Sequence, residues 1–457
     1  MLRFMKFGAL LLFSLLSAIV LKAQDQPGKN KQDLLEESDY QYLQHLTKDV
    51  LESARLYPGG AGDNHTGGIL IRPGGNYPSF WIRDYAMSLE SGLVGKEEQE
   101  HMLLLTASNQ CDQTWITAGG SMVPYGAIAD HIRTDDALPI YFPGTYSYKE
   151  QGTEAWGKVP PYDDQFYFIH MGYYFVKTFA GKDILQQKIN GTRLIDRMET
   201  AFHVPPSHLD NHIIYTTDNF RGVDFGFRDA ETITGDLCFS SILKYRASNE
   251  LAQLFDLLGN KKKAEEYRLI AKKIKEAIPR IFADEKGMLR ASTGKSNQPD
   301  VWGTALAVYF GVLDNKNMEG ACKTLNDAYK NGTLAYKGNI RHILTTDDFN
   351  DHSAWEISMA SKNTYQNGAY WGTPTGWVCY AIAKVDKQSA EKLAKEYIDD
   401  LKETDYRKGK DYGGPYECFY PPDYKQNPVY LTTVSCPYAV FRFIREKNGN
   451  THIKTRK

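Results

Sequence analysis

A helical hydrophobic period recurs along this chain in two alternating forms, and it constrains the fold more than any other feature. In residues 261–282 the apolar side chains fall on one stripe with charged residues opposite, which predicts a half-buried surface helix. In residues 235–258 apolar residues cover more of the circumference, which predicts a helix enclosed by others. Leu-Gly-Asn at 258–260 separates the two and is typical of a helix end.

The two kinds of helix alternate along the chain as six hairpins. Connections from an enclosed helix to the next surface helix are short, whereas those leading back are long and rich in Gly, Pro and Tyr. This arrangement predicts an all-α fold, an (α/α)6 toroid with long loops on the active-site face. We expect outer helices near 32–56, 97–110, 190–203, 261–282, 316–330 and 388–404, and inner helices near 80–94, 163–181, 235–258, 300–314, 368–385 and 430–446.

The N-terminal segment has the pattern of a secretory signal peptide. Arg3 and Lys6 precede an apolar run from Ala9 to Leu21, which ends near the small residue Ala23. We therefore expect residues 1–23 to be removed, leaving 24–457 as a single (α/α)6 catalytic domain that is periplasmic or secreted. No later stretch approaches the ~20 apolar residues of a membrane span, so we expect no membrane insertion after signal cleavage. We also expect a monomer.

Charge and motifs exclude several classes of function. The chain has 54 basic and 56 acidic residues, so charge gives no reason to expect nucleic acid as a partner. There is no HExxH sequence, P-loop or dinucleotide fingerprint, and we predict neither a catalytic metal nor a cofactor. The six cysteines are widely spaced without a CxxC pair; Cys418 and Cys436 either pair in an oxidising compartment or remain buried thiols.

The segments that enter the inner helices share one chemical character. Each brings carboxylates, amides or Trp and Tyr rings, which is the combination that recognises the faces and vicinal hydroxyls of sugars. The alternative for each tryptophan is core packing, and for Asp84 a helix N-cap. The recurrence at nearly every inner-helix start favours a cleft. The candidate substrate-binding residues are Trp81, Arg83, Asp84, Asp163, Gln165, Trp302, Gln366, Asn367, Trp371 and Trp377.

Three of these segments resemble a known family. FWIRDYAMSLESG at 80–92, GFRDAETITGD at 226–236 with the helices that follow, and QNGAYWGTPTGW at 366–377 are similar to motifs of the six-hairpin glycosidases, in particular the clan of trehalases, glucoamylases and processing α-glucosidases. Phe227-Arg228-Asp229 departs from the clan's Gly-Trp-Asp. The resemblance implies an inverting glycosidase, in which Asp229 takes the position of the general acid and Glu417 that of the base.

The local sequence bears on both assignments. Asp229 lies among Phe225, Phe227 and Phe239, and such an apolar setting raises the pKa of a carboxyl group. An inward-pointing Arg228 would oppose this effect. Glu417 lies in a Gly- and Tyr-rich segment without an adjacent cation, where we expect an ionised loop carboxylate. Asp164 competes for the role of acid, because it opens a very aromatic inner helix.

These observations together predict an exported glycoside hydrolase that acts on a terminal sugar of an oligosaccharide or polysaccharide. Two carboxyl groups would perform acid/base catalysis without a cofactor. One alternative is a polysaccharide lyase on the same toroid, although the cleft segments carry more acids than bases. The other is a glycan-binding protein that has lost catalysis, which would need the aromatic and amide side chains but not a pair of carboxylates across the pocket.

Overall fold

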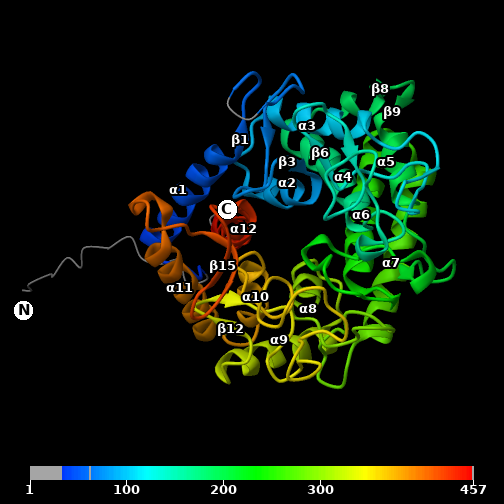
Figure 1. Ribbon diagram of the computed structural model, residues 1–457. Coiled ribbons are helices and arrows are strands. Elements are labelled where there is room, and N and C mark those ends of the chain that lie inside the picture. The colour runs from blue at the N-terminus through cyan, green and yellow to red at the C-terminus, as the bar shows by residue number, and fades with distance from the viewer. Residues whose placement is uncertain (1–32, 61–62, 455–457) are drawn as a thin grey trace, which may run out of the picture.

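In the computed structural model, residues 33–60 and 63–454 are described, and they form a ring of helices (Figure 1). The expected signal peptide lies outside these residues. Each inner helix contacts the next, and the last contacts the first again, which closes the ring. The inner helices are α2 (Ile82–Ser88), α4 (Asp163–Phe179), α6 (Cys238–Leu257), α8 (Val301–Tyr309), α10 (Thr375–Ile382) and α12 (Leu431–Lys454).

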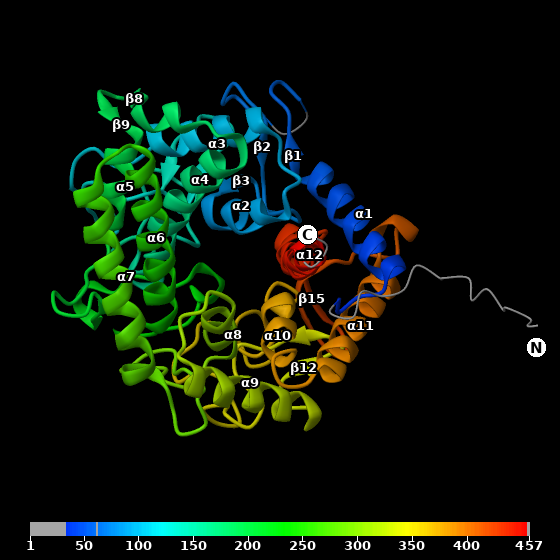
Figure 2. The same ribbon diagram turned by 180° about the vertical axis from the view of Figure 1, so that it is seen from behind.

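Six further helices surround this ring and alternate with it along the chain. They are α1 (Glu37–Ala54), α3 (Lys96–Ser108), α5 (Leu194–Phe202), α7 (Lys261–Phe282), α9 (Asn315–Lys330) and α11 (Lys387–Thr404). Figure 2 shows the same ring from behind, with the outer helices at its periphery. The predicted all-α (α/α)6 toroid is therefore confirmed.

The hydrophobic pattern explains which helices lie inside. In α7 the buried residues form one stripe that includes Tyr267, Ile274 and Ile278, so its charged face remains in solvent. In α8, by contrast, every residue from Val301 to Val308 is buried. The α6–α7 turn contains Gly259 at φ +76°, a left-handed conformation that glycine adopts at little cost. Asn260 then caps α7 by accepting a hydrogen bond from the backbone N–H of Lys263.

One short connection differs from the prediction. Between α4 and α5 the chain forms a 3₁₀-helix, η3 (Lys182–Gln186), and a hairpin of β8 (Lys188–Ile189) and β9 (Thr192–Arg193). Asn190 and Gly191, at the tip, both have positive φ, as a tight hairpin turn requires. The outer helix consequently begins at Leu194 rather than near residue 190.

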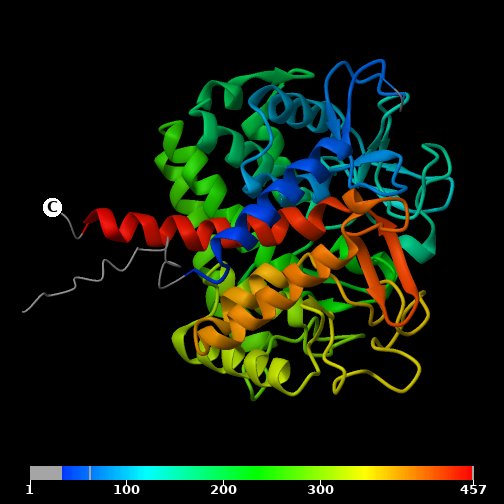
Figure 3. The same cartoon turned by 90° about the vertical axis from the view of Figure 1, so that its left-hand side faces the viewer.

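The long connections gather on the face turned toward the viewer in Figure 1 and to the right in Figure 3, while α12 projects from the other face. This loop face carries the two sheets that matter for the site. One is the antiparallel sheet of β3 (Ser79–Trp81), β6 (His131–Arg133) and β7 (Pro139–Ile140), in which Trp81 lies opposite His131. The other is the hairpin of β14 (Tyr416–Tyr420) and β15 (Tyr424–Pro428).

The remaining elements are short. Among the described residues no helix is both long and apolar enough to cross a membrane. All six cysteines are buried free thiols, so Cys418 and Cys436 are not paired. The other strand pairs are β1 (Arg55–Leu56) with β2 (Leu70–Ile71), β4 (Trp115–Ile116) with β5 (Met122–Val123), β10 (Tyr215–Thr216) with β11 (Gly235–Asp236), and β12 (Ala335–Tyr336) with β13 (Asn339–Ile340). The other 3₁₀-helices are η1 (Leu89–Ser91), η2 (Glu154–Trp156), η4 (Asp218–Phe220), η5 (Gly226–Arg228) and η6 (Tyr406–Lys408).

Candidate active site

A cavity of about 180 Å³ opens on the loop face, at the N-terminal ends of the inner helices. We call it the front cavity. Five of the predicted site residues line it: Trp81, Arg83, Asp84, Asp229 and Glu417. The remaining lining residues are Tyr77, Pro143, Gly144, Tyr146, Trp156, Gly226, Phe227, Tyr365, Gln426 and Tyr430.

Asp229 follows η5 and reaches the front cavity from the connection that leads into α6. Its side chain is buried, and the Gln366 Nε2 group donates a hydrogen bond of 2.9 Å to Oδ1. Gln366 is held in turn by the backbone N–H of Ala230, which donates to Oε1 at 2.7 Å. No other described residue donates to Asp229, so Oδ2 is free to hold a proton. Burial raises the pKa of Asp229 to about 7, although the charge of Arg83 opposes the shift.

Arg228, the neighbour of Asp229, points into a separate buried cluster. Its guanidinium donates to Asp224 at 3.0 Å and to Asp300 at 2.8 Å, and none of these three side chains is more than 1% exposed. The arginine is therefore already paired with two carboxylates. It does not neutralise Asp229, so the opposing effect considered from the sequence is absent.

Glu417 lies on β14 and is 1% exposed. Both of its carboxyl oxygens accept hydrogen bonds: the Tyr77 hydroxyl donates to Oε1 at 3.1 Å, and the Asn427 Nδ2 group donates to Oε2 at 2.6 Å. Burial raises the pKa of Glu417 to about 8, against the effect of these two donors. The sequence led us to expect a carboxylate in a polar loop, but the β14–β15 hairpin encloses this residue.

Asp84 is the third carboxyl group of the front cavity. The Tyr430 hydroxyl, from the residue before α12, donates a hydrogen bond of 2.6 Å to Oδ1 of Asp84. Burial raises the pKa of Asp84 to about 6, which the hydrogen bond from Tyr430 partly offsets. This contact joins the first and last inner helices at the mouth of the ring.

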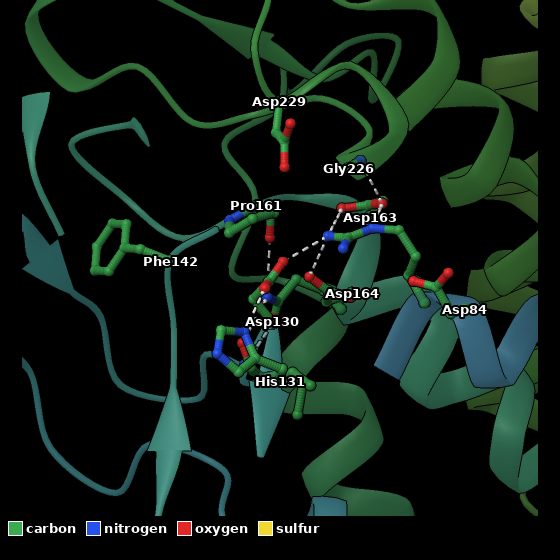
Figure 4. Close-up of polar contacts among 12 residues, drawn as sticks. Asp84, Asp130, His131, Phe142, Pro161, Asp163, Asp164, Gly226 and Asp229 are labelled. Atoms are coloured by element: carbon green, nitrogen blue, oxygen red, sulfur yellow. Dashed lines mark hydrogen bonds and ion pairs between the residues drawn. The ribbon is translucent and has the colours of Figure 1, made fainter. Parts of the chain in front are cut away.

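Arg83 anchors a buried cluster of three carboxylates beside the cavity. The distance between the Arg83 Nε and Asp163 Oδ2 atoms is 2.7 Å, and Nη2 lies 2.9 Å from Asp130 and 2.8 Å from Asp164. Figure 4 shows these three acids gathered together, with Asp229 apart from them. Asp163 and Asp164 do not line the front cavity. Asp164, the alternative acid, is instead fully buried in this cluster.

The other predicted residues lie behind the cavity wall. Gln165 accepts a hydrogen bond from the backbone N–H of Ile128, and Asn367 accepts one from that of Ala354, so both amides hold loops in place. Trp302 and Trp371 are fully buried and pack against Phe227, which does line the cavity. These two tryptophans therefore pack beneath the site, which is the core-packing alternative considered for them. Trp377 lines a small cavity inside the ring instead.

Several aromatic residues that line the front cavity were not among the candidates predicted from the sequence. Tyr77, Tyr146 and Trp156 come from long connections, where no hydrophobic period indicates which side chains turn inward. Tyr365 and Tyr430 lie in the segments that enter the inner helices α10 and α12. Their position next to Gln366 and directly before α12 was the one signal that pointed to them.

A larger cavity, of about 560 Å³, opens at the opposite end of the ring. Its acids are paired with cations: Arg246 contacts Glu90 and Glu250, and Arg442 contacts Glu446. In the front cavity, by contrast, neither Asp229 nor Glu417 forms an ion pair with any described residue. Carboxyl groups with raised pKa values and no cationic partner are typical of catalytic acids and bases. For this reason the front cavity is the candidate active site, despite its smaller volume.

Within the described ranges, no three His, Cys, Asp or Glu side chains are grouped so that they could hold a metal ion.

Comparison with known proteins gives a result for the fold. No protein-family model matches the sequence, and no curated protein does. A rhamnosidase from Klebsiella oxytoca with rhamnose bound superposes with a TM-score of 0.54 at 10% identity, over 91% of this chain and 65% of that one. A GH63 mannosylglycerate hydrolase from Thermus thermophilus, in complex with glucose, gives 0.54 at 10% identity, over 88% and 100%.

A third similar structure is a GH78 rhamnosidase of Bacillus sp. GL1, with a TM-score of 0.53 at 10% identity, over 88% of this chain and 34% of that one. The chain thus spans about two thirds of the Klebsiella enzyme and the full length of the Thermus enzyme. At this level of identity the comparisons establish the architecture. The chain has the six-hairpin fold of these glycosidases, as the sequence motifs implied.

Proposed function

We propose that this protein is an exported glycoside hydrolase that removes a terminal sugar with inversion of the anomeric configuration. One observation carries the proposal: Asp229 and Glu417, both buried and both without an ion-pair partner among the described residues, line one cavity together with Tyr and Trp rings. Two carboxyl groups flanking one sugar are what glycoside hydrolysis requires. The structural likeness to three glycosidases supports the same class of reaction.

The hydrogen bonds suggest which carboxyl group is the acid. Asp229 has one oxygen without a donor, which can hold the proton that passes to the glycosidic oxygen as the C–O bond breaks. Glu417 receives donors on both oxygens, and such bonds favour the charged form of a carboxyl group, although burial still raises the pKa of Glu417 to about 8, above the value of about 7 for Asp229. Glu417 would take a proton from water, whose oxygen attacks the anomeric carbon from the face opposite the leaving group. The two protons then balance, one given by Asp229 and one taken by Glu417.

The size of the front cavity supports action at a chain end. Its volume of about 180 Å³ lies below the ~300–1,000 Å³ of pockets that enclose drug-sized ligands. A space of this size accommodates one sugar ring rather than several. The rest of an oligosaccharide or polysaccharide would extend outward past Tyr146 and Trp156.

Localisation and assembly complete the proposal. The charged and apolar pattern of residues 1–23 supports export to the periplasm or the exterior. There the protein would meet oligosaccharides or polysaccharides as a monomer.

The two alternatives predict different chemistry. A glycan-binding protein would bind sugar in the front cavity without cleaving it. A polysaccharide lyase needs a cation to neutralise the uronate of its substrate, but Arg83, the one Lys or Arg side chain among the described residues lining the cavity, already contacts three carboxylates.

A screen of nitrophenyl glycosides tests the proposal. The set should include both anomers of rhamnose, glucose and mannose, presented to the wild type, to Asp229→Asn and to Glu417→Gln. We expect the wild type to release nitrophenol from at least one substrate and both variants to lose this activity. Tyr412→Ala, a change at an exposed loop residue, is the matched control and should remain active. Sugar binding without release in the wild type would support the glycan-binding alternative instead.

A further inference from the structure

We propose that the cavity at the opposite end of the ring is a second, non-catalytic binding site for a neutral saccharide. We call it the rear cavity. Its walls come from the middle and C-terminal parts of inner helices, whereas the front cavity lies at their N-terminal ends. The lining includes Tyr173 on α4, Tyr245 on α6, Tyr309 on α8 and Phe443 on α12. Its volume of about 560 Å³ falls within the ~300–1,000 Å³ of ligand pockets.

The walls combine aromatic rings with amides. The rings belong to partly exposed side chains, so their faces and edges are available to a ligand. Asn249 and Gln253 add amide groups, and the Tyr173 hydroxyl donates to Oε1 of Gln253 at 3.0 Å. Flat apolar faces beside fixed polar groups match a sugar ring, which has an apolar face and hydroxyl groups at its edge. The six rings are those of Tyr173, Tyr174, Tyr245, Tyr309, Phe310 and Phe443.

The lining includes a buried acceptor that lacks a donor. Glu250 is 4% exposed, and its Oε1 atom accepts hydrogen bonds from Nδ1 of His170 at 2.7 Å and from Nε of Arg246 at 2.9 Å. Its Oε2 atom has no hydrogen-bond partner within the described part of the chain, and neither has Nε2 of His170. A buried polar atom without a partner is costly, and a ligand hydroxyl could donate to it.

A single water molecule would satisfy Glu250 but would not account for the space. Water occupies ~30 Å³ in the liquid, a small part of the rear cavity. A smaller cavity of about 20 Å³ continues inward toward His170 and shares Glu90, Arg246 and Tyr309 with the rear cavity. The rear cavity therefore has room for a whole ring beside Glu250, a lining residue whose Oε2 atom has no partner within the described part of the chain.

The charges of the rear cavity favour a neutral ligand. Arg246 lies 3.3 Å from Glu90 and 2.9 Å from Glu250, and Arg442 lies 3.0 Å from Glu446. The guanidinium of Arg246 also stacks over the Phe310 ring at 5.0 Å. Since each charged group already has a partner, an ionic ligand would gain little and would meet a like charge. A polyhydroxylated ring avoids that repulsion.

The same pairing argues against catalysis in the rear cavity. Burial alone would raise the pKa of Glu250, but His170 and Arg246 hold it below its ordinary value. Glu250 therefore remains charged and cannot supply a proton at neutral pH. A saccharide would be bound there without being cleaved.

The test is a calorimetric titration of the full-length Glu417→Gln variant with neutral sugars: glucose, galactose, mannose, rhamnose, maltose and cellobiose. Tyr245→Ala combined with Phe443→Ala removes two aromatic rings from the wall of the rear cavity, and Asn249→Trp independently fills the cavity. Tyr412→Ala is the control. We expect at least one sugar to show a binding event that weakens tenfold or more in both rear-cavity variants but not in the control. Circular dichroism verifies that each variant is folded.

The outcomes separate this inference from the proposed function. When Glu417 is left intact, both rear-cavity variants should turn over substrate at wild-type rates, because they lie outside the front cavity. If the wild type cleaves no glycoside but the rear-dependent binding is present, the second site stands while the proposed function fails. If no sugar binds, or if all binding is unaffected by both rear-cavity variants, the second site is refuted.

Discussion

Asp229 and Glu417 contribute their carboxyl groups to one cavity from the entrances of α6 and α12, which stand on opposite sides of the inner ring. Neither forms an ion pair with a described residue, and burial raises the pKa of both. The Arg83 and Arg228 guanidinium groups are each paired with other carboxylates. The ring thus places two protonatable groups at its mouth, while nearby arginines are paired with Asp163 and Asp300.

Asp229→Asn should strongly reduce cleavage of glycosides with poor leaving groups. A general acid contributes ~10²–10⁴-fold, but a dinitrophenolate leaves without protonation. We therefore expect this variant to lose ~10²–10⁴-fold activity on alkyl glycosides and much less on dinitrophenyl glycosides. Steady-state kinetics with both substrates measures the difference. An equal loss on both would contradict the assignment of Asp229 as the acid.

Glu417→Gln should lose activity on every substrate, because water must still be activated whatever the leaving group is. We expect a loss of ~10²–10⁴-fold with sugar binding retained. Azide, a nucleophile that needs no base, should partly restore turnover and yield a glycosyl azide that mass spectrometry detects. If the Glu417→Gln variant were fully active on a dinitrophenyl glycoside without azide, Glu417 would be the acid, and the two roles would be exchanged.

The pH dependence of kcat/KM follows from the two raised pKa values. The active form needs Asp229 protonated and Glu417 ionised. Raising the pH through about 7 removes the proton of Asp229, and raising it through about 8 ionises Glu417. The profile should be bell-shaped, with a maximum between these values and only ~5% of the enzyme in the active form.

The Asp229→Asn variant separates the two limbs of this profile. On a dinitrophenyl glycoside its rate should rise with pH through about 8, as Glu417 ionises, and then remain constant. If the rate of this variant instead falls as the pH rises over this range, the group that still titrates acts as an acid, which would contradict the scheme.

Asp229→Asn should also stabilise the folded protein at alkaline pH. The pKa of Asp229 is raised from 3.8 to about 7, so ionising it in the folded state costs free energy. This cost is absent below pH ~4, grows up to pH ~7 and is complete above it. We expect the variant to gain on the order of 1–4 kcal/mol in the free energy of unfolding at pH 8 and nothing at pH 4.

Denaturant titration at both pH values measures this gain, with Asp351→Asn, a change at an exposed loop acid, as the control. An equal gain at both pH values would mean that the amide stabilises by packing rather than by removing a buried charge.

The helices could be predicted because their pattern is long and repetitive. The stripe of α7 continues through the whole helix, and α8, which is apolar along almost its whole length, could only be enclosed. The α4–α5 connection is longer than predicted because Asn190 and Gly191 form a local turn. The hydrophobic period of the flanking helices does not indicate such a turn.

The candidate site was predictable in part, for a different reason. Trp81 and Asp84 lie at the start of α2, and Asp229 lies in the connection that leads into α6, so the fold itself directs them to the mouth of the ring. Trp302 and Trp371 share that position but turn beneath Phe227, because large rings also fill the core. Tyr77 and Trp156 depend on the paths of long loops, which are determined by tertiary contacts rather than by any local pattern.

The configuration of the first-formed sugar tests the central claim most directly. Proton NMR of the wild type with an active aryl glycoside follows the anomeric signal before mutarotation equilibrates it. We predict that the released sugar has the opposite configuration to the substrate, because water attacks from the face of Glu417 while Asp229 protonates the leaving group. A product that retains the configuration of the substrate would contradict this account.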